Sequence, residues 1–558
     1  MCEPRKPHPP VTRILIAPDY IVRVFAGTTA AVVRVFAGTT AARVRCFRPH
    51  LNVKATHAIQ PVALVGSVVY LAWLLFGYLA GVGGVQRHHV ESASYILAVI
   101  AGWTAFTRVT PSSAIATPED AWWWGRLPLF IAAAFVLYGS ALGLGLFSDD
   151  FVLVERAAGG QWLDRTGFVR PLPTALWQAI LTVGGGAVSL HAVNILLHGI
   201  NAALLSRLGE RIGLSRGEAV ASGIGFLVFP SSVEAVVWPA AIIDLLATTS
   251  ALGFVLASER RPTRAGIAVG AAILLAGLLS KETAVVIPVL ACLVWVRWPH
   301  VRSTPGLLTL ATGVAITIAY TVVRAAIVQI PGGFLQPPTR YLLKEMVARP
   351  IGTLTLPWSQ SVLASSWWLG YLGAVTFIVL LAFYSWRPQK AIPPSFVVRC
   401  VIAVLLSVVP VYSMLSISPD LENGRYVYLP TAFWVIGLAA MAAGEHGGLG
   451  RIARTIAFTA IAVAAVVGVQ WHLSPWKEAA AVRDEVLAAA LGVEDTSSCA
   501  TRIFSGAPDS VRGAYVFRNG LAQAVAASRR PAADRSRAGE CRYVWTGSSF
   551  RLDSTSSP

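Results

Sequence analysis

The sequence has few charged residues, and this excludes an ordinary soluble protein. Only 13% of its 558 residues are Asp, Glu, Lys or Arg, whereas soluble domains carry about 25%. Hydrophobic residues make up 55% of the chain, and the mean hydropathy is +0.62. Apolar runs long enough to cross about 30 Å of hydrocarbon recur along most of its length. Because these runs are continuous rather than alternating, they predict an all-α polytopic membrane protein and exclude a transmembrane barrel.

The sequence also lacks the cysteine spacings that bind zinc. None of its six cysteines belongs to a CxxC or Cys/His pattern. Cys292 and Cys400 lie in apolar runs, where cysteine behaves as a small buried hydrophobe. Cys499 and Cys541 bracket the polar C-terminal segment. They predict a disulfide there if that segment faces an oxidising compartment.

The chain is strongly basic, with a net charge of +17 and a pI of about 10.0. In a soluble protein this charge would indicate nucleic-acid binding. The sequence contains no nucleic-acid motif and no basic block interleaved with aromatic residues. Lys and Arg instead flank the apolar runs, where they set the orientation of membrane helices. We therefore expect the lipid bilayer, and no nucleic acid, as a partner.

Composition divides the chain into four segments. Residues 1–60 are basic and lack periodicity, which predicts a disordered cytoplasmic tail. Two extra transmembrane helices are expected in 61–124, and about 11 further spans in 125–471. Residues 472–558 are polar, begin with an amphipathic stretch and contain short strand-like pieces, which predicts a small α+β domain. The 13 candidate spans are 61–84, 93–109, 127–147, 188–206, 217–231, 238–257, 265–280, 283–297, 306–326, 368–386, 397–416, 428–444 and 455–471.

Charges in the loops predict the orientation of these spans. With the basic N-terminus inside, every second loop is short and carries an excess of Lys and Arg, as cytoplasmic loops do. An odd number of spans then places the C-terminus outside. We expect a multi-pass protein of the plasma (inner) membrane with a cytoplasmic N-terminus and an extracytoplasmic C-terminal domain. The basic residues of the inner loops are Arg207, Arg211, Arg216, Arg260, Arg261, Arg264, Arg297, Arg302, Arg387, Lys390, Arg451 and Arg454.

An acidic pair, Asp149 and Asp150, directly follows the 127–147 span on the predicted outer face. Two Asp residues that merely end a helix in water are the ordinary interpretation. Negative charge at a helix C-terminus is disfavoured by the helix dipole, however, so the pair calls for a further reason.

Other charged residues also fall near the predicted outer ends of spans. Ionisable groups in or beside a span are costly, which makes these positions informative. Scattered interfacial salt bridges are one interpretation, and a shared cavity is the one that their convergence favours. The residues are Arg170, Glu234, Lys281, Glu282 and Arg425, with Asp244 inside the span that follows Glu234.

A polar stripe follows one helix in the segment HAVNILLHGIN. His191, Asn194, His198 and Asn201 are spaced by three, four and three residues, which places all of them on one face. His191 and His198 are two turns apart, so one metal ion would not readily take both from a straight helix. Hydrogen bonds between helices are the favoured interpretation, and metal ligation is the alternative.

The sequence motifs around the acidic pair, the polar stripe and the other charged residues occur in an order that carries a resemblance over about 125–470. The chain resembles the membrane region of GT-C glycosyltransferases. Within them it is similar to the dolichyl-phosphate-mannose-dependent O-mannosyltransferases, especially the TMTC proteins and their bacterial relatives. The resemblance implies a GT-C-like bundle of about 11 spans, preceded here by two extra spans. The motifs are SDDFVL with FVRPL, HAVNILLHGINAALL, FPSSVEAVVWPAAIIDLLA, LLSKETAVVIP and GRYVYLP.

The resemblance implies transfer of a hexose, such as mannose, from a polyprenyl-phosphate donor to a protein or glycan acceptor. It assigns the acidic pair to the catalytic site, with Asp149 as general base and Asp150 as its neighbour. A carboxylate can take the proton of an acceptor hydroxyl, and the leaving phosphate needs Arg, Lys or a divalent metal. We expect Arg425, Lys281 and Arg170 to bind the phosphate. The supporting polar residues are then Glu234, Glu282, His191, His198, Asn194 and Asp244.

Two other functions remain open at this stage. A transporter or lipid-linked-sugar flippase would also have many spans and charges near the membrane. An inactive scaffold for envelope assembly would keep the spans without needing the acidic pair. The position of the charges at one face, rather than the midplane, favours the glycosyltransferase.

Overall fold

The structure is a computed structural model, and its described part belongs to one compact unit, 62–558. The predicted cytoplasmic tail and the predicted spans at 61–84, 93–109 and 368–386 lie outside that part. The ranges that it describes are 121–162, 169–259, 263–296, 306–327, 349–359, 392, 394–414, 417–443, 448–496, 501–528 and 540–553.

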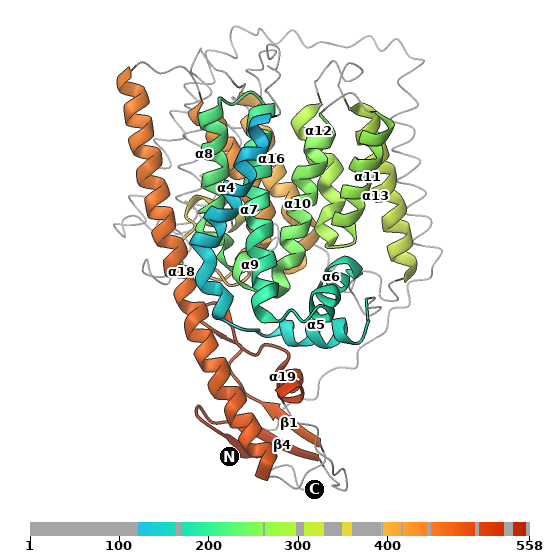
Figure 1. Ribbon diagram of the computed structural model, residues 1–558, viewed down its shortest axis with the longest axis vertical. Coiled ribbons are helices and arrows are strands. Elements are labelled where there is room, and N and C mark those ends of the chain that lie inside the picture. The colour runs from blue at the N-terminus through green and yellow to red at the C-terminus, as the bar shows by residue number, and fades with distance from the viewer. Residues whose placement is uncertain are drawn as a thin grey trace, which may run out of the picture. The chain divides into compact units, whose positions relative to one another are not determined.

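Long apolar helices form the bulk of this unit (Figure 1). Among the described residues, six helices are long and apolar enough to cross a membrane, or seven if the bent pair Arg216–Leu227 and Pro230–Val237 forms one span. Three of the predicted spans are shorter apolar helices, so the predicted total stays a prediction. The helices of this bundle, long and shorter together, are α4 (Ala121–Tyr138), α7 (Ala187–Arg211), α8 (Arg216–Leu227), α10 (Ile242–Ala257), α11 (Arg264–Leu278), α12 (Ile287–Trp295), α13 (Leu307–Ile327), α16 (Pro394–Val408), α17 (Tyr428–Ala442) and α18 (Gly448–Thr496).

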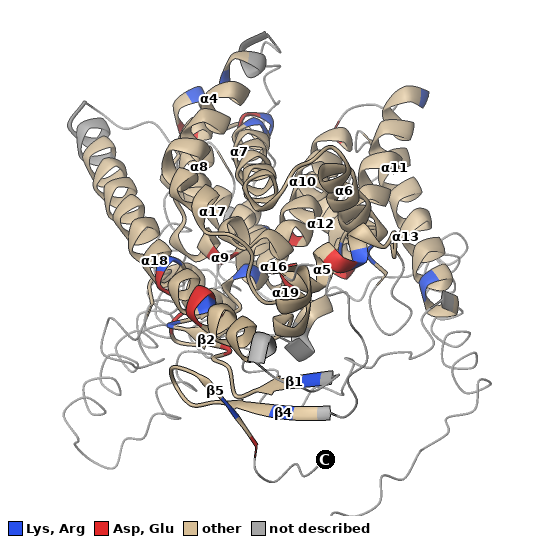
Figure 2. Ribbon diagram, turned by 60° about the horizontal axis from the view of Figure 1, so that its bottom comes forward, with Lys and Arg blue, Asp and Glu red and all other residues tan. Residues whose placement is uncertain are grey.

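Charged residues lie mainly near the ends of these helices, and long uncharged stretches separate them (Figure 2). At the predicted cytoplasmic ends, several Arg residues also form ion pairs. Glu210 accepts from Arg126 at 2.7 Å and from Arg207 at 3.0 Å. Arg211 lies 3.4 Å from Glu259. These arginines therefore stabilise helix contacts in addition to their expected role in orientation.

Short helices connect the long ones at the opposite end of the bundle. The span that starts with α4 ends in a 3-10 turn, and α5 then runs across the bundle rather than along it (Figure 1). Pro residues begin α6 and two of the 3-10 turns, where a missing N–H costs nothing. The short elements are η2 (Gly139–Gly143), α5 (Asp149–Ala158), α6 (Pro171–Thr182), η3 (Pro230–Ser232), α9 (Val233–Val237), η4 (Pro239–Ala241), η5 (Glu282–Val286), η7 (Val409–Met414) and η8 (Gly424–Val427).

After α18, the described residues of the C-terminal segment form two small sheets and one helix. In the first sheet β1 pairs with β4 in parallel, and β4 pairs with β5 antiparallel. The other two strands form an antiparallel hairpin. Cys541 in β4 is disulfide-bonded; Cys499 lies outside the described residues, so the predicted pairing stays a prediction. The elements are β1 (Thr501–Ser505), β2 (Ser510–Val511), β3 (Ala514–Tyr515), α19 (Leu521–Ser528), β4 (Glu540–Trp545) and β5 (Phe550–Leu552).

One continuous helix joins the membrane region to this segment. The 49 residues of α18 include both the predicted last span and the predicted amphipathic stretch, with Pro475 inside the helix. The division expected at 471/472 therefore falls within a helix. Trp476 of α18 packs edge-on against Phe147, with ring centroids 5.2 Å apart, and against Tyr515 at 6.2 Å. The C-terminal segment is thus packed on the connections between the long helices.

The predicted orientation can be tested at the two ends of α7. This helix has 25 residues and is therefore about 37 Å long. A membrane-impermeant maleimide applied from outside is expected to label Ala158→Cys at the end of α5 but not Gly217→Cys at the start of α8. Both residues are exposed. The reversed labelling pattern would overturn the orientation, and lysed vesicles, in which both cysteines react, are the control.

Candidate active site

A cavity of about 640 Å³ lies where α5, α6, α10 and the C-terminal segment meet. The described residues of its wall include one carboxylate, Asp149, and four cationic side chains. Apolar and aromatic residues such as Val152, Leu153 and Ile243 line the rest. The cations are Arg156, Arg170, Lys281 and Arg425. The structure thus brings four of the residues singled out in the sequence to one cavity, and it adds Arg156.

The acidic pair begins a helix instead of ending one. Asp149 and Asp150 form the first turn of α5, and Ser148 is the residue before it. The dipole of a helix favours negative charge at this end. The argument from an unfavourable dipole was therefore wrong, because a break of several residues after η2 separates the pair from the preceding span.

The two aspartates differ in environment. Asp150 is fully buried, and its carboxylate accepts from the backbone N–H groups of Phe147 at 2.8 Å and Ala240 at 2.7 Å. Burial raises the pKa of Asp150, while these two hydrogen bonds act in the opposite direction. Asp149 is only half-buried and lines the cavity. Of the pair, only Asp149 is among the residues that line the cavity, where a substrate could contact it. The Asp150 carboxylate instead joins the residues before α5 to η4 through its two hydrogen bonds.

Three of the four cations are held by carboxylates from other elements. The exposed fractions of the paired side chains range from 2% to 21%, so solvent screens them weakly. All three carboxylates are residues that the sequence singled out as supporting groups. The pairs are Arg170 with Glu282 at 2.7 Å, Lys281 with Asp244, and Arg425 with Glu234.

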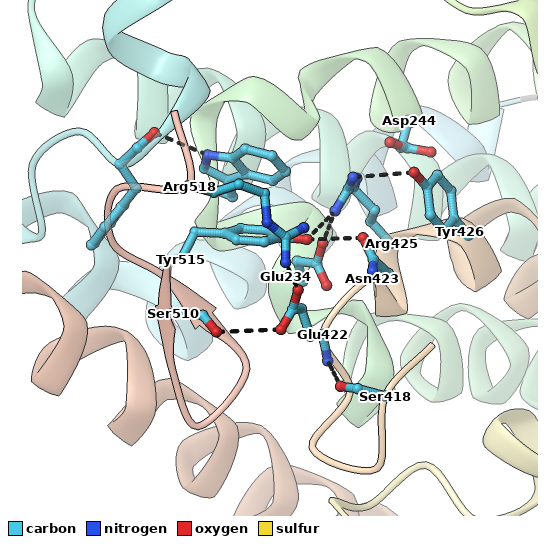
Figure 3. A network of polar contacts seen from close by, with 12 residues as sticks. Glu234, Asp244, Ser418, Glu422, Asn423, Arg425, Tyr426, Ser510, Tyr515 and Arg518 are labelled. Carbon is cyan, nitrogen blue, oxygen red and sulfur yellow. Dashed lines mark hydrogen bonds and ion pairs between the residues drawn. The ribbon is translucent and has the colours of Figure 1, made fainter. Parts of the chain in front are cut away.

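Arg425 is more enclosed than Arg170, with exposed side-chain fractions of 13% and 21%. Its guanidinium lies 4.7 Å from the ring centroids of both Trp238 and Tyr426. It donates to Glu234 and, at 2.9 Å, to the Tyr515 hydroxyl (Figure 3). Stacking and hydrogen bonds together fix the plane of the guanidinium, as suits bidentate binding of an oxyanion.

Tyr515 connects the C-terminal segment to this arginine. Its hydroxyl accepts from Arg425 and donates to the Asn423 side-chain oxygen at 2.9 Å. Burial raises the pKa of Tyr515, so the hydroxyl keeps the proton that it donates. Nearby, Arg518 pairs with Glu422, which also accepts from Ser510 at 3.3 Å (Figure 3).

The polar stripe of α7 lies inside the helix bundle and away from the cavity wall. His191 contacts the Gly145 carbonyl oxygen at 2.7 Å, and Asn194 donates to the Trp238 carbonyl oxygen at 2.9 Å. His198 lies 2.8 Å from the Tyr428 hydroxyl. His191 and Asn194 thus contact connections between helices, at Gly145 and Trp238, whereas His198 makes the favoured contact between helices, from α7 to α17. Within the described ranges no group of three His, Cys, Asp or Glu side chains is arranged to hold a metal ion.

Comparison with known proteins supports the resemblance drawn from the motifs. No protein-family model matches the chain. Protein O-mannosyl-transferase Tmtc2 of Drosophila melanogaster is 30% identical over 189 residues, covering 27% of this chain and 19% of that protein. The predicted similarity to TMTC proteins is confirmed over this stretch. The chain spans about a fifth of the length of that relative.

Among solved structures, the crystal structure of ArnT from Cupriavidus metallidurans bound to undecaprenyl phosphate gives a TM-score of 0.42 at 13% identity. The match covers 72% of this chain and 88% of that chain.

Sequence reasoning missed the contribution of the C-terminal segment to the site. Asn519, Gly520 and Gln523 line the cavity, and Tyr515 holds Arg425. The segment GAYVFRNGL, residues 513–521, contains three of these residues. Its polar side chains gave no indication that they reach the acidic pair. They reach it only because the chain after α18 folds back along that helix onto α5.

Proposed function

We propose that the protein is a membrane glycosyltransferase. It transfers a hexosyl group, such as mannose, from a polyprenyl-phosphate donor to a hydroxyl of an extracytoplasmic protein or glycan. The observation that supports this most is the cavity wall, where one accessible carboxylate shares a cavity with cations fixed by ion pairs. The stretch of similarity to an O-mannosyltransferase points to the same chemistry.

In the proposed reaction the acceptor oxygen attacks the anomeric carbon of the sugar. The bond between that carbon and the phosphate oxygen breaks, and its electron pair leaves with the polyprenyl phosphate. The hydroxyl proton passes to the carboxylate of Asp149. The departing phosphate gains negative charge, which Arg425, Lys281 and Arg170 stabilise. Because their carboxylate partners hold these cations in place beforehand, little reorganisation is needed in the transition state.

The apolar part of the wall suits the lipid portion of such a donor. Val152, Leu153, Ile242 and Ile243 face the cavity from α5 and α10, beside the charged groups. A polyprenyl chain can leave along these residues toward the bilayer while its phosphate meets the cations. A soluble nucleotide-sugar would gain nothing from this wall, since apolar contacts favour an apolar chain.

The direct test is sugar transfer in proteoliposomes from a defined polyprenyl-phosphate-sugar to a glycan or peptide acceptor. The expected result is a glycosylated acceptor and released polyprenyl phosphate, both identified by mass spectrometry. Movement of the intact lipid-linked sugar across the bilayer without transfer would instead support the flippase.

Arg425→Gln is expected to raise the donor KM by roughly 10-fold or more, because hydrogen bonds to charged groups contribute about 1.5–3 kcal/mol. The acceptor KM should change little. Glu234 is buried and loses its partner in this variant, so Arg425→Gln combined with Glu234→Gln is the matched control for folding. An unchanged donor KM in both variants would remove Arg425 from the phosphate site.

A further inference from the structure

The C-terminal segment reaches the acidic pair through the turn between β3 and α19. Asn519 and Gly520, just before α19, lie in the wall of the cavity. The Asn519 side-chain amide donates to the Oδ1 atom of Asp149 at 2.6 Å. No described residue makes a hydrogen bond with the other carboxylate oxygen, Oδ2. One oxygen of Asp149 is thus fixed, and the other remains available in the cavity.

Backbone contacts hold the same turn against the start of α5. Ser148 has a φ of +43°, a conformation that is unfavourable for a residue with a side chain. Its N–H donates to the Val516 carbonyl oxygen at 3.0 Å, and its hydroxyl accepts from the Asn519 N–H at 3.2 Å. Phe151 and Phe517 stack with ring centroids 5.8 Å apart. The C-terminal segment therefore maintains the strained residue that precedes Asp149.

We propose that Asn519 is the positioning residue of Asp149, and that the C-terminal segment thereby completes the active site. This inference rests on the proposed function, in which Asp149 is the general base. An amide suits the task because it is a neutral donor. It fixes the carboxylate and directs Oδ2 toward the acceptor hydroxyl. An Arg or Lys in its place would stabilise the ionised carboxylate more strongly and weaken it as a base.

Gly520 allows the close approach that this contact requires. Its φ is +84°, and a Cβ atom there would overlap the Ser148 carbonyl oxygen and lie 3.2 Å from the Cβ of Phe151. Gly547, in the turn between β4 and β5, has a similar φ of +101°, but a Cβ would meet nothing within 4 Å. A substitution at either glycine would strain the backbone. Only at Gly520 would the added Cβ atom also push the C-terminal segment away from α5.

The first test combines substitutions at Asn519 and Asp149. Asn519→Ala is expected to lower kcat roughly 10-fold, up to the 100-fold that misplacement of about 1 Å can cause, with the donor KM within about 2-fold of wild type. Asn519→Asp should lower it further, since two facing carboxylates share a proton and Asp149 then cannot accept one from the acceptor. In an Asp149→Asn background, Asn519→Ala should have no additional effect, because the group that it positions is already absent.

The second test uses the two glycines in the full-length protein. Gly520→Ala should lower kcat by a factor similar to that of Asn519→Ala, whereas Gly547→Ala should keep wild-type transfer. Thermal unfolding of both variants separates loss of positioning from loss of folding.

The outcomes distinguish this inference from the proposed function. If Asp149→Asn abolishes transfer while Asn519→Ala keeps the wild-type kcat, the positioning role is overturned and the base remains. The role is also overturned if Asn519→Ala lowers activity equally with and without Asp149. If neither variant affects transfer, Asp149 is not the general base and the positioning role fails with it, whereas the proposed function itself fails only if the wild-type protein transfers no sugar.

Discussion

Replacing Asp149 by Asn is expected to lower sugar transfer by roughly 100-fold or more, the scale on which a positioned general base contributes. The amide keeps the shape of the carboxylate and its contact with the cavity but cannot take the proton of the acceptor. Binding of the lipid donor should change little, because the cations are untouched. Turnover in proteoliposomes tests the loss of transfer. Donor binding, measured in the same preparation, tests whether the cations still hold the donor.

Asp150→Asn provides the comparison, and the structure predicts a different defect for it. The carboxylate accepts from two backbone N–H groups, of Phe147 and Ala240. An Asn oxygen serves one of them, and the other loses its acceptor, which costs about 1–3 kcal/mol. The expected result is a lower unfolding temperature rather than a specific loss of chemistry. If both variants retain full turnover, the carboxylate mechanism is wrong, and another group must take the proton of the acceptor.

Breaking the buried pair of Lys281 and Asp244 should have the largest effect on stability. The exposed fractions of the two side chains are 2% and 8%, so neither charge can recover its hydration in the folded protein. Asp244→Ala leaves Lys281 buried and uncompensated, which is expected to cost about 3–5 kcal/mol. Thermal unfolding in detergent measures this loss as a lower transition temperature.

Removing both charges separates stability from activity. Asp244→Leu combined with Lys281→Met should unfold near the wild-type temperature, because apolar residues often replace a buried ion pair without loss. Transfer should still fall, since the phosphate loses one of its cations. Wild-type transfer by the folded double variant would show that Lys281 has a structural role only.

The membrane region could be predicted well because hydropathy is a local property. Helices α4, α7, α8, α10, α11, α12, α13, α16, α17 and α18 each overlap a predicted span, whereas α5 and α6 lie between the predicted spans at 127–147 and 188–206, where no span was predicted. The ends were less predictable. The helix of the first GT-C-like span ends at Tyr138, and a 3-10 turn and a break precede Asp149. Apolar composition continues through that break, so the sequence placed the acidic pair at the wrong end of a helix.

The side of the membrane was predicted for each charged residue, but the partners were not. The Arg170–Glu282 pair spans 112 residues of sequence and the Arg425–Glu234 pair spans 191. Counting spans predicts on which side of the membrane a residue lies, so it places these charged residues at the same membrane surface. Which cation meets which carboxylate depends on how α9, η5 and η8 pack together. No spacing within one helix contains that information.

The sequence by itself determined the class of the protein, the positions of its helices, and the residues that gather near one face. These follow from hydropathy and loop charge, which act over short stretches of chain. Only the tertiary structure decided that Asp149 is accessible while Asp150 is buried, and that Asn519 and Tyr515 reach the cavity. This is so because α18 continues past the last span as one helix, and the chain that follows it folds back along that helix to α5. Contacts between segments about 370 residues apart depend on that geometry. A pattern of neighbouring residues in the sequence contains no information about such contacts.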